Sequence, residues 1–128
     1  MAELEHVNIT VADPQGMARM LGDLFGWQIR WEGEAMSGAG YTVHVGSKGS
    51  YVALYTGKDA APDAPARSSY TQIAGLNHLG VVVDNLSETE EKAKALGLTP
   101  RAHADYEPGR RFYVDTPYAV EIEVISYA

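Results

Sequence analysis

Two stretches of the sequence decide the fold: residues 4–11 read Leu-Glu-His-Val-Asn-Ile-Thr-Val, and residues 76–83 read Leu-Asn-His-Leu-Gly-Val-Val-Val. The first alternates apolar and polar residues, which is typical of a half-buried β-strand, and the second reads the same way. Each has a histidine in third place, His6 and His78, an offset of 78 − 6 = 72 residues. The chain is therefore predicted to contain an internal repeat.

A helix is predicted after each of these strands. The first begins at Asp13, an N-cap residue followed by proline, and ends at Gly26. The second contains Ser87 and Glu90 at the spacing of a capping box and ends at Gly97. The apolar residues expected on the buried faces are Met17, Met20, Leu21 and Leu24 in the first helix and Leu86, Ala93 and Leu96 in the second.

Three further strands are predicted after each helix, at 28–31, 41–45 and 51–55 in the first half and at 99–103, 110–114 and 120–125 in the second. Both halves then have the order βαβββ, and the fold class is α+β. We expect a single domain spanning 1–128. Module 1 covers about 1–56, a linker about 57–74, and module 2 about 75–128.

The composition narrows the chemistry and the partners. The chain has no cysteine, so any metal must be bound by nitrogen and oxygen ligands. Its net charge of -7 argues against nucleic-acid binding, because such a surface repels phosphates. No apolar run of about 18 residues and no signal-peptide pattern is present, so we expect no membrane partner and a cytoplasmic location.

Alternation along the strands places several polar side chains on one face. The apolar residues of the first strand should face its helix, which leaves His6 on the opposite face of the sheet. The same reasoning places His78 on that face, and in the last strand it leaves Glu121 and Glu123 there. Two histidines and two carboxylates are thus expected on one surface.

Short motifs in both halves resemble a known family. They are the histidine early in each half, the Gly-Trp pair at 26–27, and the closing strands that read Arg-Arg-Phe-Tyr at 110–113 and Glu-Ile-Glu at 121–123. This pattern is similar to the vicinal oxygen chelate superfamily, which includes glyoxalase I, extradiol dioxygenases, methylmalonyl-CoA epimerase and the bleomycin and fosfomycin resistance proteins. The resemblance covers nearly the whole chain. It implies that the paired modules form a cleft-shaped mixed β-sheet with the helices on its outer face.

The resemblance also implies a divalent metal ion bound by His6, His78 and Glu123. Nitrogen and carboxylate ligands suit Fe, Mn, Ni, Co and Zn alike. Glu123 is chosen over Glu121 because the family's usual Asp-Pro-Asp-Gly turn aligns with residues 116–119, Thr-Pro-Tyr-Ala. Glu121 is then a candidate base beside the metal, so Glu121 and Glu123 are the predicted catalytic residues.

Not every position is matched between the halves or with the family. The equivalent of Glu123 in the first half is Ala53, so one carboxylate of the family's four-ligand members is missing. The turn at 116–119 lacks the family's Asp and Gly. His44 and His103 have no counterpart in the other half and are not expected to bind the metal.

Four residues are candidates for substrate binding. Tyr51, Tyr55 and Tyr113 should face the cleft, where they can bind an aromatic substrate, although tyrosine is also common in strands because it packs well there. Arg111 shares the face of Tyr113. It is a candidate for holding a substrate carboxylate, and an exposed strand charge is the alternative.

Two functions remain open from the sequence. The first is a metal-dependent enzyme acting on a small substrate with two adjacent oxygens, either a glyoxalase-like lyase or isomerase or a small ring-cleaving dioxygenase. The alternative is a metal-free protein of the bleomycin-resistance type, which sequesters a ligand in the same cleft. In either case we expect a homodimer, because sheets of about four strands leave edges that can pair with a partner.

Overall fold

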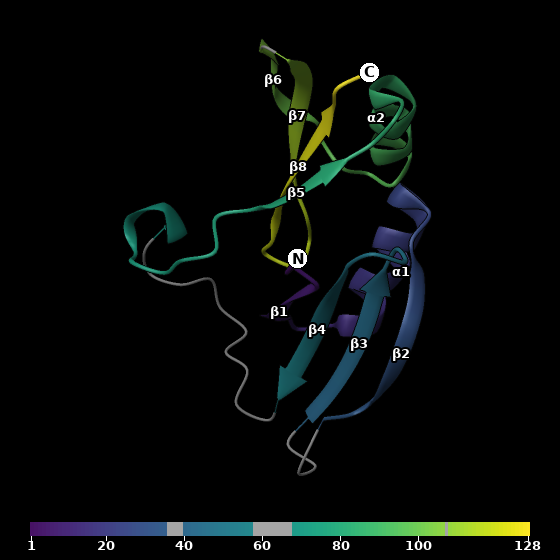
Figure 1. The fold of residues 1–128 in the computed structure, drawn as a ribbon, viewed down its shortest axis with the longest axis vertical. Helices are drawn as coiled ribbons and strands as arrows, with labels where there is room; N and C mark the ends of the chain where they lie inside the picture. Colours follow the sequence, from purple (N-terminus) through teal and green to yellow (C-terminus); the bar gives the residue numbers. More distant parts are fainter. Residues whose placement is uncertain (36–39, 58–67, 107) are drawn as a thin grey trace. The chain divides into compact units, whose positions relative to one another are not determined.

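The computed structural model describes residues 1–35, 40–57, 68–106 and 108–128. The chain divides into two compact units, Met1–Pro62 and Asp63–Ala128, which are described in turn (Figure 1). Each unit has the element order βαβββ, so the predicted α+β fold of two such modules is confirmed. Residues 58–67 of the predicted linker lie outside the described residues.

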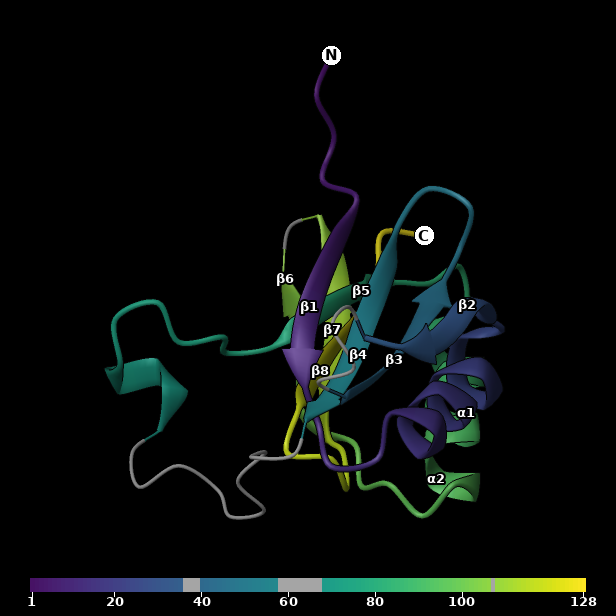
Figure 2. The same cartoon turned by 90° about the horizontal axis from the view of Figure 1, so that it is seen from below.

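The first unit is a four-stranded mixed sheet with a helix on one face (Figure 2). Its elements are β1 (His6–Thr10), α1 (Pro14–Phe25), β2 (Gln28–Glu34), β3 (Gly40–Gly46) and β4 (Tyr51–Gly57). The strand order is β1-β4-β3-β2, in which β1 and β4 are parallel and the other neighbours are antiparallel. Helix α1 packs on β2, β3 and β4, so the opposite face of the sheet is left for other contacts.

The ends of α1 follow from local sequence. The Asp13 side chain accepts a hydrogen bond from the amide of Gly16 at 2.9 Å, and Pro14 occupies the first helical position. Gly26 ends the helix with φ 73°, a left-handed conformation that glycine adopts without strain. Both predicted caps are confirmed. The predicted apolar stripe is buried as well: Met17, Met20, Leu21 and Leu24.

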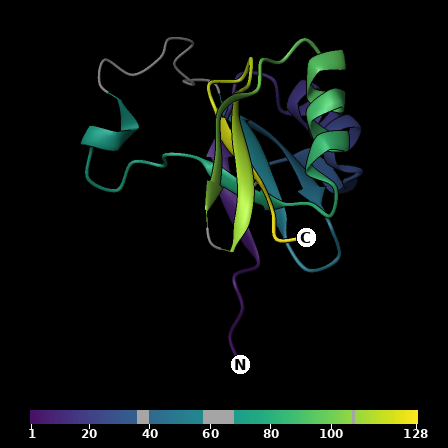
Figure 3. The same ribbon diagram turned by 90° about the horizontal axis from the view of Figure 1, so that it is seen from above.

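The second unit repeats this topology. Its elements are a short 3-10 helix η2 (Ser69–Thr71), β5 (Leu79–Val82), α2 (Leu86–Ala95), β6 (Arg101–Tyr106), β7 (Gly109–Asp115) and β8 (Glu121–Ser126). The strand order is β5-β8-β7-β6, with β5 and β8 parallel. Helix α2 packs on β7 and β8 (Figure 3), over a core that includes Phe112, Val114, Ile122 and Val124.

Helix α2 starts differently from the prediction, while the predicted Gly97 follows its C-cap in the left-handed conformation, with φ 82°. Its N-cap is Asn85, whose side chain accepts a hydrogen bond from the amide of Glu88 at 3.0 Å. The predicted capping box at Ser87 is therefore wrong, because the helix starts earlier with the buried Leu86 and takes Ser87 into its first turn. Leu96 was expected on the buried face but is 39% exposed, since it lies just beyond the last helical residue.

Strand β6 begins and ends later than the predicted 99–103. Its pairing with β7 shifts register between Arg101 and Ala104, and Ala102 within this shift has φ 55°. Such a bulge changes which side chains of the strand share a face, so regular alternation does not hold in β6.

No helix in the described ranges is long and apolar enough to cross a bilayer.

The turn between β7 and β8 is held by Thr116. Its hydroxyl donates a 2.7 Å hydrogen bond to the carbonyl of Val120 and accepts from the amides of Tyr118 and Val120 at 3.3 Å. Ala119 takes φ 62°, the left-handed conformation that disfavours side chains with a Cβ. A threonine and a strained alanine thus form the turn in which the sequence lacks the family's Asp and Gly.

The Ala119→Gly substitution is expected to stabilise the protein. It relieves the left-handed alanine, and after the entropy cost of glycine in the unfolded chain the gain should be about 0.5–1 kcal/mol, or roughly 2–4 °C in Tm. Thermal unfolding followed by circular dichroism measures it. Ala104→Gly in β6 is the control and should lower stability by about 0.5–1 kcal/mol. A lower Tm for Ala119→Gly than for the wild type would contradict the strain argument.

Candidate metal centre

His78 lies immediately before β5, and its two ring nitrogens face different groups. The parallel pairing of β5 with β8 aligns Gly80 with Glu123, which brings the histidine beside the carboxylates at the start of β8. Nε2 of His78 lies 3.4 Å from Oε1 of Glu123, and Nδ1 lies 3.5 Å from Oε1 of Glu121. The structure thus brings three of the predicted site residues together in the second unit.

Glu121 is held by two side chains that the sequence analysis missed. Its Oε1 accepts a 2.6 Å hydrogen bond from the hydroxyl of Tyr70, and its Oε2 accepts one from Arg101. Arg101 also donates to both carboxylate oxygens of Asp115, at 3.1 and 2.8 Å. Burial raises the pKa of Glu121, but the hydrogen bonds from Tyr70 and Arg101 outweigh burial and hold that pKa below its ordinary value. A carboxylate bound in this way is a weak base, which favours a positioning role.

Glu123 is flanked by two residues of β7. Nη1 of Arg111 lies 3.5 Å from Oε2 of Glu123 and donates a 2.6 Å hydrogen bond to the hydroxyl of Tyr113. The Tyr113 ring meets His78 edge-on, with ring centres 5.3 Å apart. Strand β7 therefore adds a cation and an aromatic ring beside the pair formed by His78 and Glu123.

In the first unit, His6 and Tyr51 are partners in the parallel pair β1 and β4. The His6 ring stacks on Tyr51 with centres 4.9 Å apart, and its Nδ1 lies 2.9 Å from Oε1 of Glu5. His44 stacks on Tyr51 at 4.7 Å, and Trp31 lies 5.2 Å from His44. Burial, together with nearby positive charges, lowers the pKa of His44. A row of rings therefore crosses the sheet from β1 to β2, and its member Trp31 was not among the predicted site residues.

Ala53 takes the place in the first sheet that Glu123 takes in the second. Ala53 pairs with the residue two positions after His6, and Glu123 pairs with the residue two positions after His78. The Ala53 side chain is only 2% exposed and has no donor atom for a metal. Tyr55 follows on the same face of β4 and is half-buried.

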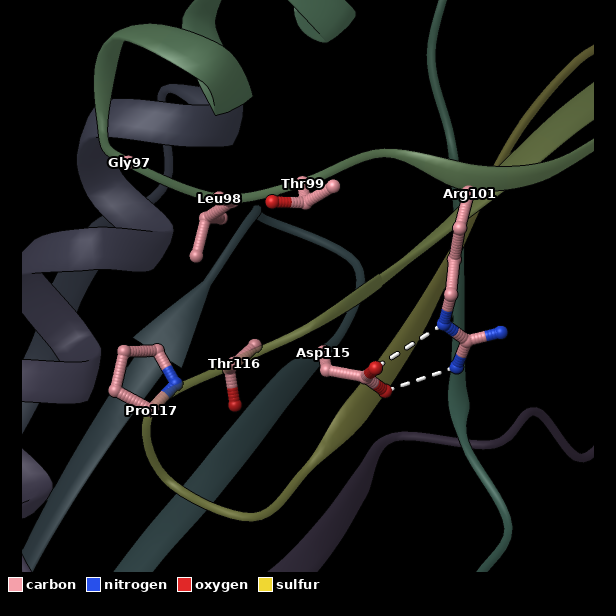
Figure 4. Close-up of a pocket in the computed structure, with 7 residues that line it drawn as sticks. All are labelled: Gly97, Leu98, Thr99, Arg101, Asp115, Thr116 and Pro117. Atoms are coloured by element: carbon pink, nitrogen blue, oxygen red, sulfur yellow. Dashed lines mark hydrogen bonds and ion pairs between the residues drawn. The ribbon is translucent and has the colours of Figure 1, made fainter.

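The second unit contains a pocket of about 460 Å³ beside the end of α2 and the turn after β7 (Figure 4). It is lined by residues 97–99, Arg101 and residues 115–117, and the guanidinium group of Arg101 points to Asp115. None of the predicted site residues lines it. It shares Arg101 and Asp115 with the network around His78 but none of the predicted site residues, so the pocket does not define the candidate site.

The distance between the His78 and Glu123 side chains suits two ligands of the same metal ion. Two ligand atoms, each about 2.1 Å from an ion at tetrahedral or octahedral angles, lie about 3.0–3.4 Å apart, and Nε2 of His78 is 3.4 Å from Oε1 of Glu123. Within the described parts of the chain, no group of three His, Asp or Glu side chains is assembled as a metal site. His6 belongs to the first unit, and its part in the same site stays a prediction.

A family model for the Glyoxalase/Bleomycin resistance protein/Dioxygenase superfamily matches residues 3–124. No curated protein matches the chain in sequence.

Solved structures with a similar fold cover nearly the whole chain. A glyoxylase/bleomycin resistance protein/dioxygenase domain from Frankia sp. EAN1pec is 18% identical, with a TM-score of 0.81 and 98% of each chain covered. The fosfomycin resistance protein FosX from Mesorhizobium loti is 21% identical, with a TM-score of 0.71 and coverage of 97% of this chain and 90% of that one. FosX from Listeria monocytogenes, in complex with Mn(II) and sulfate, is 16% identical, with a TM-score of 0.70 and coverage of 98% and 93%.

Proposed function

The chain belongs to the Glyoxalase/Bleomycin resistance protein/Dioxygenase superfamily, and from this premise we propose that it is a metal-dependent enzyme whose small substrate binds through two adjacent oxygens. His6, His78 and Glu123 are the proposed ligands of a divalent ion of Fe, Mn, Ni, Co or Zn. When bound, the ion supplies Lewis-acid stabilisation of negative charge on the substrate oxygens. The proposed reaction is that of a glyoxalase-like lyase or isomerase, or of a small ring-cleaving dioxygenase.

The contact between His78 and Glu123 is the observation that carries this proposal. Nε2 and Oε1 are 3.4 Å apart, the spacing of two atoms that bind one ion. The other nitrogen, Nδ1, faces Tyr70 and Glu121, and metal-binding histidines commonly direct their second nitrogen to such a partner. The Mn(II) in the FosX structure from Listeria monocytogenes supports a divalent ion in this fold family.

The charges around His78 favour an anionic substrate. The carboxylates of Asp115, Glu121 and Glu123 outnumber the guanidinium groups of Arg101 and Arg111 by one charge. A divalent ion would change this excess from one negative to one positive charge. A substrate that carries, or develops, one negative charge on adjacent oxygens would then neutralise the site.

The substrate contacts are proposed for residues on the face of each sheet that is directed away from its helix. Arg111 and Tyr113 lie beside Glu123 and can bind the part of the substrate next to the metal. Tyr51 and Tyr55 face away from α1 on β4 and can contact an apolar or aromatic portion.

A second candidate function is favoured by Ala53. A metal-free protein that sequesters a ligand does not need a complete ligand set, and Ala53 supplies no donor where Glu123 does in the other half. The row of rings formed by His6, Tyr51, His44 and Trp31 would suit stacking of a planar ligand.

Metal stoichiometry separates the two candidates. For the enzyme, protein purified without chelator and analysed by mass spectrometry for metals should contain an ion. Titration of the apoprotein with Mn(II), Co(II), Ni(II) and Zn(II) should then give one tight site per chain for at least one of them. The absence of any site tighter than about 100 μM would instead favour the metal-free binding protein.

A homodimer is also proposed. Strands β1 and β2 are the edges of the first sheet, and β5 and β6 are the edges of the second. Val82 on the edge strand β5 is 64% exposed, which is unfavourable for an isolated chain. Sedimentation equilibrium at micromolar concentration should give twice the chain mass of 13.9 kDa. A species of 13.9 kDa would refute the dimer.

A further inference from the structure

Tyr70 reaches the second sheet from the short turn η2 that precedes β5. The hydroxyl of Ser68 accepts a 3.2 Å hydrogen bond from the amide of Tyr70, and the carbonyl of Ser68 accepts one of 2.9 Å from the Thr71 side chain. The tyrosine is 57% exposed, yet its hydroxyl touches two groups of the candidate site. It lies 3.1 Å from Nδ1 of His78 and 2.6 Å from Oε1 of Glu121.

A single proton fixes the direction of both hydrogen bonds. The Tyr70 hydroxyl has one hydrogen, and Glu121 is an ionised carboxylate that can only accept, so the hydrogen points to Glu121. An ordinary phenol has a pKa of about 10, so the hydroxyl keeps this hydrogen near neutral pH. The Tyr70 oxygen is then an acceptor towards His78. Nδ1 of His78 forms a 3.1 Å hydrogen bond with this oxygen, whereas Nε2 is 3.4 Å from the competing acceptor Glu123 and forms only an ion-pair contact with it. The geometry therefore favours a neutral imidazole with its proton on Nδ1 and the lone pair of Nε2 towards Glu123.

Arg101 keeps Glu121 in the orientation that this arrangement needs. It donates to Oε2 of Glu121 while both of its hydrogen bonds to Asp115 anchor the guanidinium group. Oε1 of Glu121 is left to face Tyr70. Asp115, Arg101, Glu121, Tyr70 and His78 thus form one continuous chain of hydrogen bonds.

We propose that Tyr70 is a positioning residue that accepts the Nδ1 proton of His78 and thereby selects the tautomer whose Nε2 faces Glu123. Only that tautomer offers a lone pair on the nitrogen next to the carboxylate. The selection of the tautomer is a property of the apoprotein. Its consequence for metal binding rests on the proposed function.

The tautomer can be measured directly. In apoprotein with isotope-labelled histidine, at about pH 8 where ordinary imidazoles are neutral, two-bond proton–nitrogen NMR correlations distinguish the two tautomers. The His78 signals are assigned from the spectrum of His78→Gln. We expect mainly the Nδ1–H form in the wild type and at least a two-fold smaller fraction of it in Tyr70→Phe. Tyr127→Phe is the matched control, because Tyr127 is also 57% exposed, and it should leave the fraction unchanged.

Glu121→Gln is the second variant. In this variant no carboxylate holds the Tyr70 hydrogen, so the hydroxyl can donate to Nδ1 of His78 instead of accepting from it. The Nδ1–H fraction should therefore fall here too. A wild type that holds His78 mainly as Nε2–H, or a Tyr70→Phe protein with an unchanged fraction, would overturn the inference.

Metal titration of the same proteins separates this inference from the proposed function. Tyr70→Phe should weaken metal binding by about 10- to 100-fold, the usual effect of removing a partner of a metal-binding histidine. If the wild type binds no metal but Tyr70→Phe changes the tautomer, the proposed function fails and the role of Tyr70 stands. If metal binds tightly and the tautomer is unchanged, the role of Tyr70 fails and the proposed function stands.

Discussion

The His78→Ala protein is expected to bind its metal at least about 100-fold more weakly than the wild type. Partners outside the ligand shell already contribute 10- to 100-fold to metal affinity, so loss of a direct ligand should cost more. Among the described residues, only His78 places one ring nitrogen beside Glu123 and the other beside Glu121 and Tyr70. Calorimetric titration of the apoprotein measures the change, and Glu123→Ala should behave alike.

His103→Ala is the matched control for this substitution. His103 is in the same unit and its Nε2 is 3.0 Å from Oε1 of Glu90, a contact between β6 and α2 outside the candidate site. Its removal should leave the metal affinity within about two-fold, while circular dichroism confirms that both variants are folded. Full metal occupancy in folded His78→Ala protein would remove His78 from the ligand set.

The parts of the fold that were predicted well depend on local signals. Asp13 and Gly26 bracket α1 because a side-chain cap and a left-handed glycine act within one helical turn. In α2 two residues, Asn85 and Ser87, are both able to cap, and the choice between them depends on the burial of Leu86. That burial is a tertiary contact, which local sequence does not contain.

Strand alternation predicted the faces of β8 correctly, whereas β6 does not alternate regularly. Glu121 and Glu123 alternate with buried Ile122, as a regular strand requires. In β6 the left-handed Ala102 shifts the register, and alanine gives no sequence signal for such a conformation.

The candidate site was predicted in part for the same reason. His78 and its two carboxylates are found by alternation and by the repeat, whereas Tyr70 lies in a stretch that the composition assigned to a linker. Ser68, which caps the turn that holds Tyr70, was the available signal. Arg101 was missed because its role depends on Asp115, 14 residues further along the chain.

The Ala53→Glu substitution is expected to have two opposing effects. Ala53 is 2% exposed, so a carboxylate there should lower the stability of the apoprotein by roughly 2–4 kcal/mol through its desolvation. Ala53 also holds the position of Glu123 in the other half, so the new carboxylate should act as a fourth ligand and tighten metal binding. Added metal should then restore more stability than it gives the wild type. Turnover should fall, because the new ligand competes with the substrate for the ion.

Thermal unfolding with chelator and with saturating metal tests this, and Ala53→Gln is the control because it has the same size without the charge. The metal-induced rise in Tm should follow the order Ala53→Glu, then wild type, then Ala53→Gln. If Ala53→Glu folds and metal raises its Tm no more than that of Ala53→Gln, Ala53 does not face the ion. The equivalence of β4 and β8 would then hold for the strand register but not for the metal ligands, and His6 would lose its main support as the third ligand.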